Sequence, residues 1–285
     1  MIYIPQTLTD AWLLEDIQGG DLTTRTLMIG SRPGTIAFHH RHGGCVSGIT
    51  PAAQMLHSLG LKIDARCEDG SHVEAGETLL RASGRADALH QGWKAAQNLL
   101  EWSCGVADCT ANMLSVLRSR RPEGRIACTR KAIPGTRLLG TQAIIAAGGL
   151  IHRAGSAETV LLFTNHRCFL EDGDNWVQAI SFLRKRSPEK KIAVEADSPD
   201  EALAALHAEP DILQLDKFTP AQARRLAAQA KLIAPRCTLA ITGGINLTTL
   251  PDYLDCGVDL FVTSTPWYAP PADIRVVLQP TQNKA

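Results

Sequence analysis

The sequence predicts an α/β protein in which a small N-terminal α/β layer precedes a βα barrel, either complete or partial. Short apolar segments separated by turn residues occupy the first part of the 285-residue chain, and strands alternate with helices from about residue 125 onwards. Repeated βα units form a parallel sheet, and six or more in succession favour a barrel. The length is sufficient for one large domain or two ordinary ones.

The N-terminal layer is expected to contain short strands and one helix, followed by a long helix that leads to the barrel. The long helix spans residues 87–117, with Leu89, Trp93 and Leu100 on one face. We expect a break near residues 103–105, where Ser and Gly interrupt the helical pattern. The expected strands span residues 35–39, 43–47, 61–67 and 77–82, and the short helix spans 51–59.

The barrel region consists of apolar strands, each followed by a helix. The expected strands span residues 125–129, 159–163, 192–195, 212–215, 238–242 and 260–263. The expected helices span residues 141–147, 176–185, 199–206, 220–230 and 247–254. Polar residues stand at the carboxyl ends of these strands, which is the edge where βα barrels build their active sites. These residues are Thr129, Arg130, Thr164, Asn165, Glu195, Asp216, 242–244 and 263–265.

A basic segment runs from Thr129 to Arg153 without any Asp or Glu. It contains Arg130, Lys131, Arg137, His152 and Arg153, with several glycines among them, whereas the whole chain balances 29 acidic against 29 basic residues. Arginine offers planar forks for phosphate or carboxylate, lysine offers a point charge, and glycine lets backbone amides approach a ligand. The segment predicts a local anion site, with a small phosphate ester as its ligand.

Two carboxylates close neighbouring strands of the expected barrel. Glu195 and Asp216 would project into one cavity, where they are suited to holding Mg²⁺ or to stabilising positive charge on a sugar ring. The alternative is that each carboxylate caps the helix or turn that follows it. Their equivalent positions favour a functional site.

A Gly-Gly turn follows the strand 238–242 and is expected to open a helix. Thr242, Gly243 and Gly244 would then offer free amides and a hydroxyl to a phosphate, supported by the helix N-terminus. Thr263 and Ser264, after the next strand, would add hydroxyls to the same phosphate site. The alternative is an ordinary loop.

Composition excludes several other classes of protein. Net charge is zero, aromatic residues are few, and no nucleic-acid-binding motif is present, so nucleic acid is not expected as a partner. The apolar runs are too short for a membrane helix, and the N-terminus lacks the features of a signal peptide, which indicates a cytoplasmic protein. The eight cysteines form no CxxC pair and are expected to be buried thiols. His39, His40 and His42 are not expected to form a metal site, because neighbouring strand residues point to opposite faces and no carboxylate or cysteine spacing completes a tetrahedral site.

Taken together, these motifs resemble those of the quinolinate phosphoribosyltransferase family, also called nicotinate-nucleotide pyrophosphorylases. The resemblance implies an N-terminal α/β sandwich domain and an incomplete α/β barrel, in a homodimer whose active sites are completed across subunits. We place the sandwich at residues 1–110, with the tail 267–285 packed on it, and the barrel at 111–266. The matching runs are 15–16, 20–24, 96–100, Gly105, 129–131, 134–135, Arg137, 148–149, 152–153, 165–166, Glu195, 215–216 and 243–244.

The resemblance also implies roles for individual residues. Arg130, Lys131, His152 and Arg153 would bind an anionic substrate and the diphosphate, and Lys131 would take part in catalysis. Glu195 and Asp216 would face Mg²⁺ and the ribose of phosphoribosyl diphosphate (PRPP). Thr242, Gly243, Gly244, Thr263 and Ser264 would hold the 5-phosphate. Diphosphate would leave C1, and a ring nitrogen of a heterocyclic acceptor would attack the oxocarbenium-like centre.

Three positions depart from the family pattern. Phe163 stands where the family has a lysine that faces the substrate's carboxylate, so binding of a dicarboxylate such as quinolinate should be weakened. Lys94 aligns with an arginine donated by the partner subunit and lacks its bidentate fork. Ser264 replaces a small glycine. This pattern resembles a divergent branch called ModD, pyrophosphorylases associated with molybdenum transport operons.

The leading interpretation is therefore a Mg²⁺-dependent phosphoribosyltransferase with an acceptor less acidic than quinolinate. The first alternative is a conventional quinolinate enzyme of NAD synthesis. A second is a non-catalytic regulatory protein that senses a nucleotide, although phosphate binding alone requires neither Glu195 nor Asp216. A third is a Schiff-base aldolase using Lys131 or Lys217.

Overall fold

The computed structural model describes residues 2–281, and its contacts divide the chain into two compact units. The first unit comprises Met1–Ala111, Ala132–Gly148 and Pro266–Ala285, and the second comprises Asn112–Lys131 and Gly149–Thr265. Residue 1 and residues 282–285, the end of the expected C-terminal tail, lie outside the described residues. The division groups Ala132–Gly148 with the first unit, whereas the boundaries expected from the sequence place this segment in the barrel.

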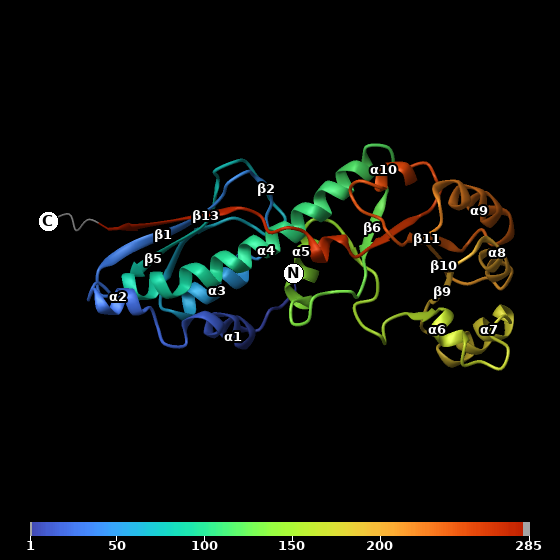
Figure 1. Ribbon diagram of the computed structural model, residues 1–285, viewed down its shortest axis with the longest axis horizontal. Helices are drawn as coiled ribbons and strands as arrows, with labels where there is room; N and C mark the ends of the chain where they lie inside the picture. The colour runs from blue at the N-terminus through green and yellow to red at the C-terminus, as the bar shows by residue number, and fades with distance from the viewer. Residues whose placement is uncertain (1, 282–285) are drawn as a thin grey trace. The chain divides into compact units, whose positions relative to one another are not determined.

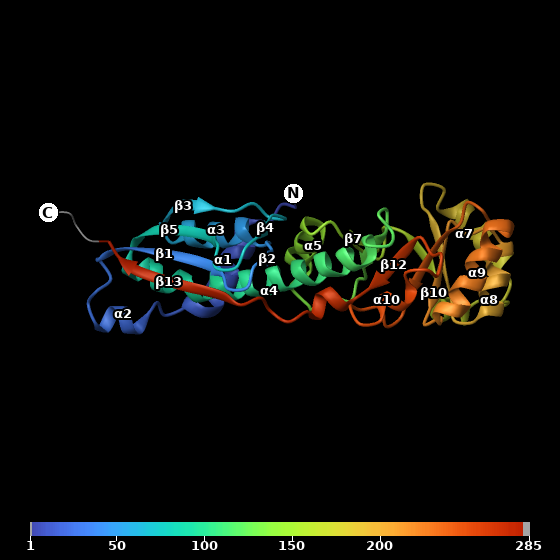
Figure 2. The same cartoon turned by 90° about the horizontal axis from the view of Figure 1, so that it is seen from above.

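The first unit is built on a four-stranded antiparallel sheet in the order β13-β1-β5-β3 (Figure 1, Figure 2). The pairing of β1 with β13 brings the C-terminal segment onto the N-terminal sheet, in a register that runs from Gly34 opposite Pro280 to His40 opposite Ile274. A separate two-stranded sheet joins β2 and β4. The strands are β1 Pro33–His40, β2 Gly44–Cys45, β3 Lys62–Arg66, β4 His72–Val73, β5 Thr78–Arg85 and β13 Ile274–Pro280.

Helices α3 and α4 cover one face of this sheet, and α1 packs against α3 (Figure 1, Figure 2). Strand β1 alternates buried and partly exposed residues, so Ile36 and Phe38 enter a core that also contains Met55 and Leu100. The helices of this unit are α1 Gln6–Ile17, α2 Leu22–Thr26, α3 Ile49–Ser58, α4 Ala86–Arg118, whose last turns belong to the second unit, and α5 Arg137–Ala146.

The expected break in the long helix near residues 103–105 is wrong, because α4 is continuous from Ala86 to Arg118. Gly105 is present for a different reason. A Cβ atom at this position would lie 2.3 Å from the backbone oxygen of Pro270, so the glycine allows the segment 270–272 to cross the helix. Ser103 likewise stays helical, and its hydroxyl donates to Ser47 Oγ at 3.0 Å.

The second unit contains a seven-stranded sheet in the order β7-β6-β12-β11-β10-β9-β8, in which every pair of strands is parallel. Strands β7 and β8 form its two edges, so the expected incomplete α/β barrel is confirmed. The strands are β6 Arg125–Cys128, β7 Leu150–Ile151, β8 Val160–Leu162, β9 Ile192–Ala196, β10 Ile212–Asp216, β11 Thr238–Thr242 and β12 Leu260–Thr263.

Helices α7, α8 and α9 lie side by side on one face of this sheet (Figure 1). Helices α8 and α9 both begin with a proline preceded by a hydroxyl cap. Ser198 accepts from the amide of Glu201, and Thr219 forms a capping box with Gln222. The helices are α6 Thr164–Arg167, α7 Trp176–Arg186, α8 Pro199–His207, α9 Pro220–Ile233 and α10 Leu250–Tyr253, and a 3₁₀ turn, Thr265–Tyr268, follows β12.

The helix expected at residues 247–254 is shorter than predicted. Asn246 accepts hydrogen bonds from the backbone amides of Thr248 and Thr249, at 2.8 and 3.0 Å, and this local turn occupies the residues that would have formed the first helical turn. Helix α10 therefore begins only at Leu250. Within residues 2–281, none of the helices combines the length and the apolar character that crossing a membrane requires.

Gly105→Ala should destabilise the first unit, although alanine normally favours a helix over glycine. The added methyl group would meet the backbone of Pro270, and we expect the free energy of unfolding to fall by about 1–3 kcal/mol in urea titrations. Gly155→Ala is the matched control, because a methyl group added at this glycine would have no other atom within 4 Å. A stabilised Gly105→Ala protein would contradict the close approach.

Candidate active site

A cavity of about 770 Å³ lies at the carboxyl ends of the strands of the second unit. All of its lining residues belong to this unit, and they include every site residue expected from the sequence except Lys94. Because the strands are parallel, residues that follow strands far apart in the sequence share this edge. The expected residues in the lining are Arg130, Lys131, His152, Arg153, Phe163, Glu195, Asp216, Thr242, Gly243, Gly244, Thr263 and Ser264.

Cationic side chains reach the cavity from β6 and β7, which are neighbours in the sheet. Arg130 and Lys131 follow β6, where the amide of Lys131 donates to Thr129 Oγ1 at 3.2 Å. His152 and Arg153 follow β7, and Arg153 has a left-handed backbone with φ 64°. Burial and the charge of Arg153 lower the pKa of His152 below its usual value, so the imidazole is neutral near pH 7.

Carboxylates occupy the strand ends of β9 and β10. Burial raises the pKa of Glu195, and the nearby charges of Asp216 and Asp197 raise it further, while a hydrogen bond from the Gln214 side-chain amide opposes the shift. The capping alternative is not supported, because Ser198 and Thr219 cap the helices that follow these strands. These carboxylates are therefore available to a ligand.

The Gly-Gly turn after β11 has the left-handed backbone that the sequence suggests, with φ 88° at Gly243 and 81° at Gly244. The predicted support from a helix N-terminus is wrong, since α10 has four residues and starts at Leu250. Instead, Thr263 Oγ1 donates to the backbone oxygen of Ile245 at 2.6 Å and fixes the loop from the neighbouring strand. The Thr263 hydroxyl therefore braces the loop, and Ser264 is the adjacent residue in the cavity lining.

Phe163 stands at the end of β8 and forms an edge-to-face contact with His166, with ring centroids 4.4 Å apart. The next residue, Thr164, donates its hydroxyl to Asp197 at 2.9 Å, and both residues line the cavity. This part of the wall therefore presents an aromatic ring and a hydroxyl–carboxylate pair. No lysine or arginine follows Phe163 until the buried Arg167.

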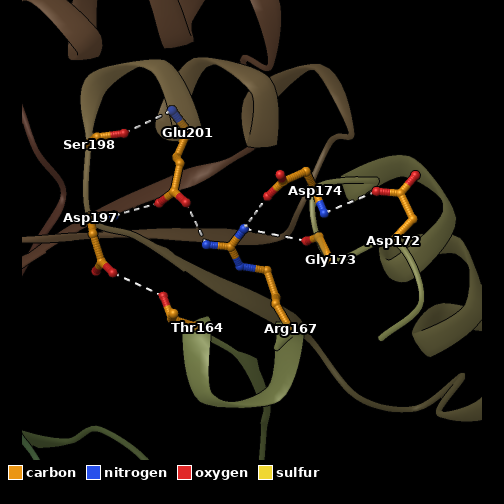
Figure 3. A network of polar contacts seen from close by, with 8 residues as sticks. All are labelled: Thr164, Arg167, Asp172, Gly173, Asp174, Asp197, Ser198 and Glu201. Carbon is orange, nitrogen blue, oxygen red and sulfur yellow. Dashed lines mark hydrogen bonds and ion pairs between the residues drawn. The ribbon is translucent and has the colours of Figure 1, made fainter. Parts of the chain in front are cut away.

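The side chain of Arg167, in α6, joins this part of the cavity wall to the first turn of α8 (Figure 3). Its guanidinium donates to Glu201 at 2.6 Å and to Asp174 at 3.2 Å, and it stacks on Trp176 with 4.3 Å to the ring centroid. Glu201 in turn accepts from the amide of Asp197 at 3.1 Å. Because Arg167 is only 6% exposed, these bonds hold α6 and the N-terminus of α8 in a fixed position. Thr164 and Asp197 are thereby oriented together.

Lys94 lies on α4 in the first unit, so its predicted role in a partner subunit's site remains a prediction. Its ammonium donates to Gln97 Oε1 at 2.8 Å and lies 4.2 Å from the ring centroid of Trp93. Arg137, which the basic segment included, begins α5 in the first unit and is not among the lining residues.

Among the polar residues of the lining, Asp197, Gln214 and Lys217 were not predicted as site residues. Gln214 has a detectable signal in the sequence, because it is a polar residue between Leu213 and Leu215 in a strand. In the structure it is buried. Lys217 was considered only as an aldolase lysine. Asp197 follows the end of β9 by one residue, where the sequence does not distinguish a site residue from a turn residue.

Comparison with known proteins identifies the family. The C-terminal domain model of quinolinate phosphoribosyl transferase matches residues 106–277, and the N-terminal domain model matches residues 21–104. A protein of Escherichia coli O6:H1 that carries the name pyrophosphorylase ModD is 66% identical over 98% of this chain and 99% of its own length. A protein of Pasteurella multocida with the same name is 45% identical over 98% of this chain and 99% of its own length.

More distant relatives agree with this result. The nicotinate-nucleotide pyrophosphorylase of Mycobacterium leprae is 29% identical over 87% of each chain. Among solved structures, the nicotinate-nucleotide pyrophosphorylase of Francisella tularensis superposes with a TM-score of 0.88 at 22% identity, covering 97% of this chain and 98% of its own. This last likeness shows the fold alone. From the two domain models and the relatives at 66% and 45% identity, the chain belongs to the quinolinate phosphoribosyl transferase family of pentosyltransferases.

Proposed function

We propose that the protein, a phosphoribosyltransferase-type pyrophosphorylase, transfers the phosphoribosyl group of PRPP to a nitrogen heterocycle less acidic than quinolinate and releases diphosphate. The observation that carries the proposal is the distribution of charge in one cavity. Cations follow β6 and β7, a glycine turn follows β11, and carboxylates follow β9 and β10. A sugar carrying anionic groups at both ends and a developing positive charge at C1 complements this arrangement.

The chemistry follows from these positions. The 5-phosphate binds the amides of Gly243 and Gly244 and the Ser264 hydroxyl, while Arg130, Lys131 and Arg153 bind the diphosphate. The C1–O bond breaks, its electron pair leaves with the diphosphate, and the lone pair of the acceptor's ring nitrogen forms the new C1–N bond. Preorganised cations stabilise the leaving group, and the carboxylates stabilise the ribose as positive charge develops. Binding both substrates in one cavity supplies the orientation.

Mg²⁺ is part of this proposal, with Glu195 and Asp216 as its protein ligands. Among residues 2–281, no group of three or more His, Cys, Asp or Glu side chains is placed so that it could hold a metal ion. Two carboxylates nonetheless fit Mg²⁺, which proteins commonly bind through one or two carboxylates together with substrate phosphates. When bound, the ion would neutralise charge on the diphosphate.

The acceptor side of the cavity favours a flat, weakly acidic ring. Phe163 offers an aromatic edge where the family pattern has a lysine, and the neighbouring Asp197 would repel a second carboxylate. His152, whose pKa is lowered by burial, is a neutral hydrogen-bonding group near pH 7 and does not add a cation. A heterocycle with fewer carboxylates than quinolinate suits this wall.

A conventional quinolinate phosphoribosyltransferase of NAD synthesis is the second candidate function. The observation in its favour is that Arg130 and Arg153 both line the cavity and retain guanidinium groups for carboxylate binding. Rescue of a strain that depends on quinolinate for NAD would support this candidate, and failure of the expressed, folded protein to rescue it would exclude it. Family membership argues against the non-catalytic and aldolase alternatives.

We propose a homodimer in which Lys94 of each subunit reaches the partner's site, as the family resemblance implies, in the cytoplasm where PRPP is available. Nucleic acid and membranes are not proposed partners. A link to molybdenum rests only on the name of the relatives.

Replacing Glu195 and Asp216 by alanine together should abolish Mg²⁺-dependent binding of PRPP, because both carboxylates that face the metal and the ribose are removed. Single Glu195→Gln and Asp216→Asn variants should lower kcat at least about 100-fold. Isothermal titration with PRPP and Mg²⁺, followed by diphosphate-release assays over a panel of heterocycles, measures both effects. Glu189→Gln, at an exposed position, is the control. Unchanged PRPP binding in the double variant would refute these roles.

Phe163→Lys should confer binding of quinolinate, with an affinity gain of about tenfold from one added charge–carboxylate contact. Phe169→Lys makes the same substitution at a side chain that is 88% exposed and does not line the cavity, so it should leave quinolinate binding unchanged. Titration of both variants with quinolinate distinguishes a local effect from a general increase in charge. Equal behaviour of the two variants would show that position 163 is not the specificity determinant.

The pH profile should report the raised pKa of Glu195. As pH falls, this carboxylate is protonated earlier than an ordinary glutamate, so kcat/KM should decline on the acid side. Gln214→Leu removes the hydrogen bond that favours the charged form, so the pKa should rise further and the acid limb should move to higher pH. An acid limb that stays in place in Gln214→Leu would assign it to another group.

A further inference from the structure

Asp216, the last residue of β10, and Lys217, the residue that follows it, both line the cavity. Successive side chains of an extended strand point to opposite faces, so in a continued strand the Lys217 side chain would point away from that of Asp216. The backbone of Lys217 is instead left-handed, with φ 56°. The left-handed conformation turns the lysine side chain back towards Asp216, and the Lys217 Nζ atom lies 3.3 Å from Asp216 Oδ2.

The surrounding loop is adapted to this lysine. The Lys217 amide donates to the backbone oxygen of Thr242 at 2.9 Å, which ties it to the strand that precedes the phosphate loop. A Cβ atom on Gly243 would lie 2.5 Å from Lys217 Cγ and 2.7 Å from its amide nitrogen. Glycine at position 243 therefore accommodates the stem of Lys217 as well as its own positive φ. The left-handed backbone of Lys217 and the glycine at position 243 together allow the Lys217 side chain to lie against the Gly243–Gly244 turn.

The ion pair with Asp216 does not explain this arrangement. The Lys217 side chain is 79% exposed, and exposed ion pairs contribute little to stability. A non-glycine residue in the left-handed region is itself unfavourable, and such strain is found where the position has a function. An exposed ammonium also retains donors for a ligand, since a lysine has three. The arrangement is better explained by a ligand than by stability.

The place of the ammonium identifies the ligand. Lys217 approaches the cavity from β10, whereas Arg130, Lys131 and Arg153 follow β6 and β7. Strand β10 pairs with β11 so that Asp216 lies opposite Thr242, immediately before the Gly243–Gly244 turn. Because the Lys217 stem lies over Gly243, its charge belongs to the phosphate loop and is separate from the cationic wall.

We propose that Lys217 is a phosphate-binding residue, whose ammonium completes the site formed by Gly243, Gly244 and Ser264 and binds the 5-phosphate monoester of the substrate. By remaining beside Asp216, it also couples occupancy of the phosphate loop to the orientation of the carboxylate that faces the ribose. This inference rests on the proposed function, and it adds to the glycine turn a charge that neutral amides and a hydroxyl lack.

Titration with ribose 5-phosphate and with inorganic diphosphate, both without metal, tests this role. Lys217→Asn is the main variant, because asparagine tolerates the left-handed backbone and its short neutral side chain removes the ammonium. It should weaken ribose 5-phosphate binding about tenfold, leave diphosphate binding nearly unchanged, and leave the melting temperature unchanged or higher. Lys217→Arg should restore part of the affinity, and Lys231→Ala, at an exposed position on α9, is the matched control.

The outcomes separate the inference from the proposed function. If the wild-type protein does not bind ribose 5-phosphate, the phosphate site itself is wrong and both fall. If it binds and Lys217→Asn binds equally well, only the role of Lys217 is overturned. Loss of diphosphate binding in place of ribose 5-phosphate binding would also overturn the assignment, since it would place the ammonium on the leaving group.

Discussion

Parallel pairing of the seven strands in the second unit is the constraint on which the candidate site depends. The register aligns Gln214 with Glu195 across β10 and β9, and Asp216 with Thr242 across β10 and β11. Residues separated by tens of positions in the sequence are thereby brought to one edge. Two hydroxyl-capped helices, α8 and α9, pack on this sheet, so the carboxylates at the strand ends are left for a ligand. Parallel pairing of the strands therefore forms the second unit and also gathers the residues of the candidate site.

Burial gives the charged groups of the cavity their chemical character. It raises the pKa of Glu195 and lowers the pKa of His152, so both shifts favour the uncharged forms. Glu195 lies among the other acidic groups and His152 beside Arg153. The cavity therefore combines permanent cations at one set of strand ends with carboxylates at another, and this separation suits a substrate whose negative charge leaves as positive charge develops on the sugar.

Local sequence signals failed at three positions, each for a different physical reason. Gly105 resembles a helix breaker, but its role is to admit the backbone of Pro270 against a continuous α4. The Gly243–Gly244 turn was expected to open a helix, but the side chain of Asn246 turns the chain first. Lys217 shows no distinguishing pattern in the sequence, since the position of its side chain depends on its own left-handed backbone and on Gly243 in the turn after β11.

The sequence by itself determined the alternation of strands and helices and the polar residues at the strand ends, because hydrophobic periodicity and these polar positions are local signals. Its collinear motifs, through their resemblance to a known family, also determined the incomplete barrel and most of the charged residues of the cavity lining. The tertiary structure decided which groups act together. Thr164 meets Asp197, Arg167 joins Glu201 and Asp174, and Lys217 turns back to Asp216 only because strand register and loop backbone set those distances. Contacts of this kind depend on side-chain direction and burial, which a linear pattern does not encode.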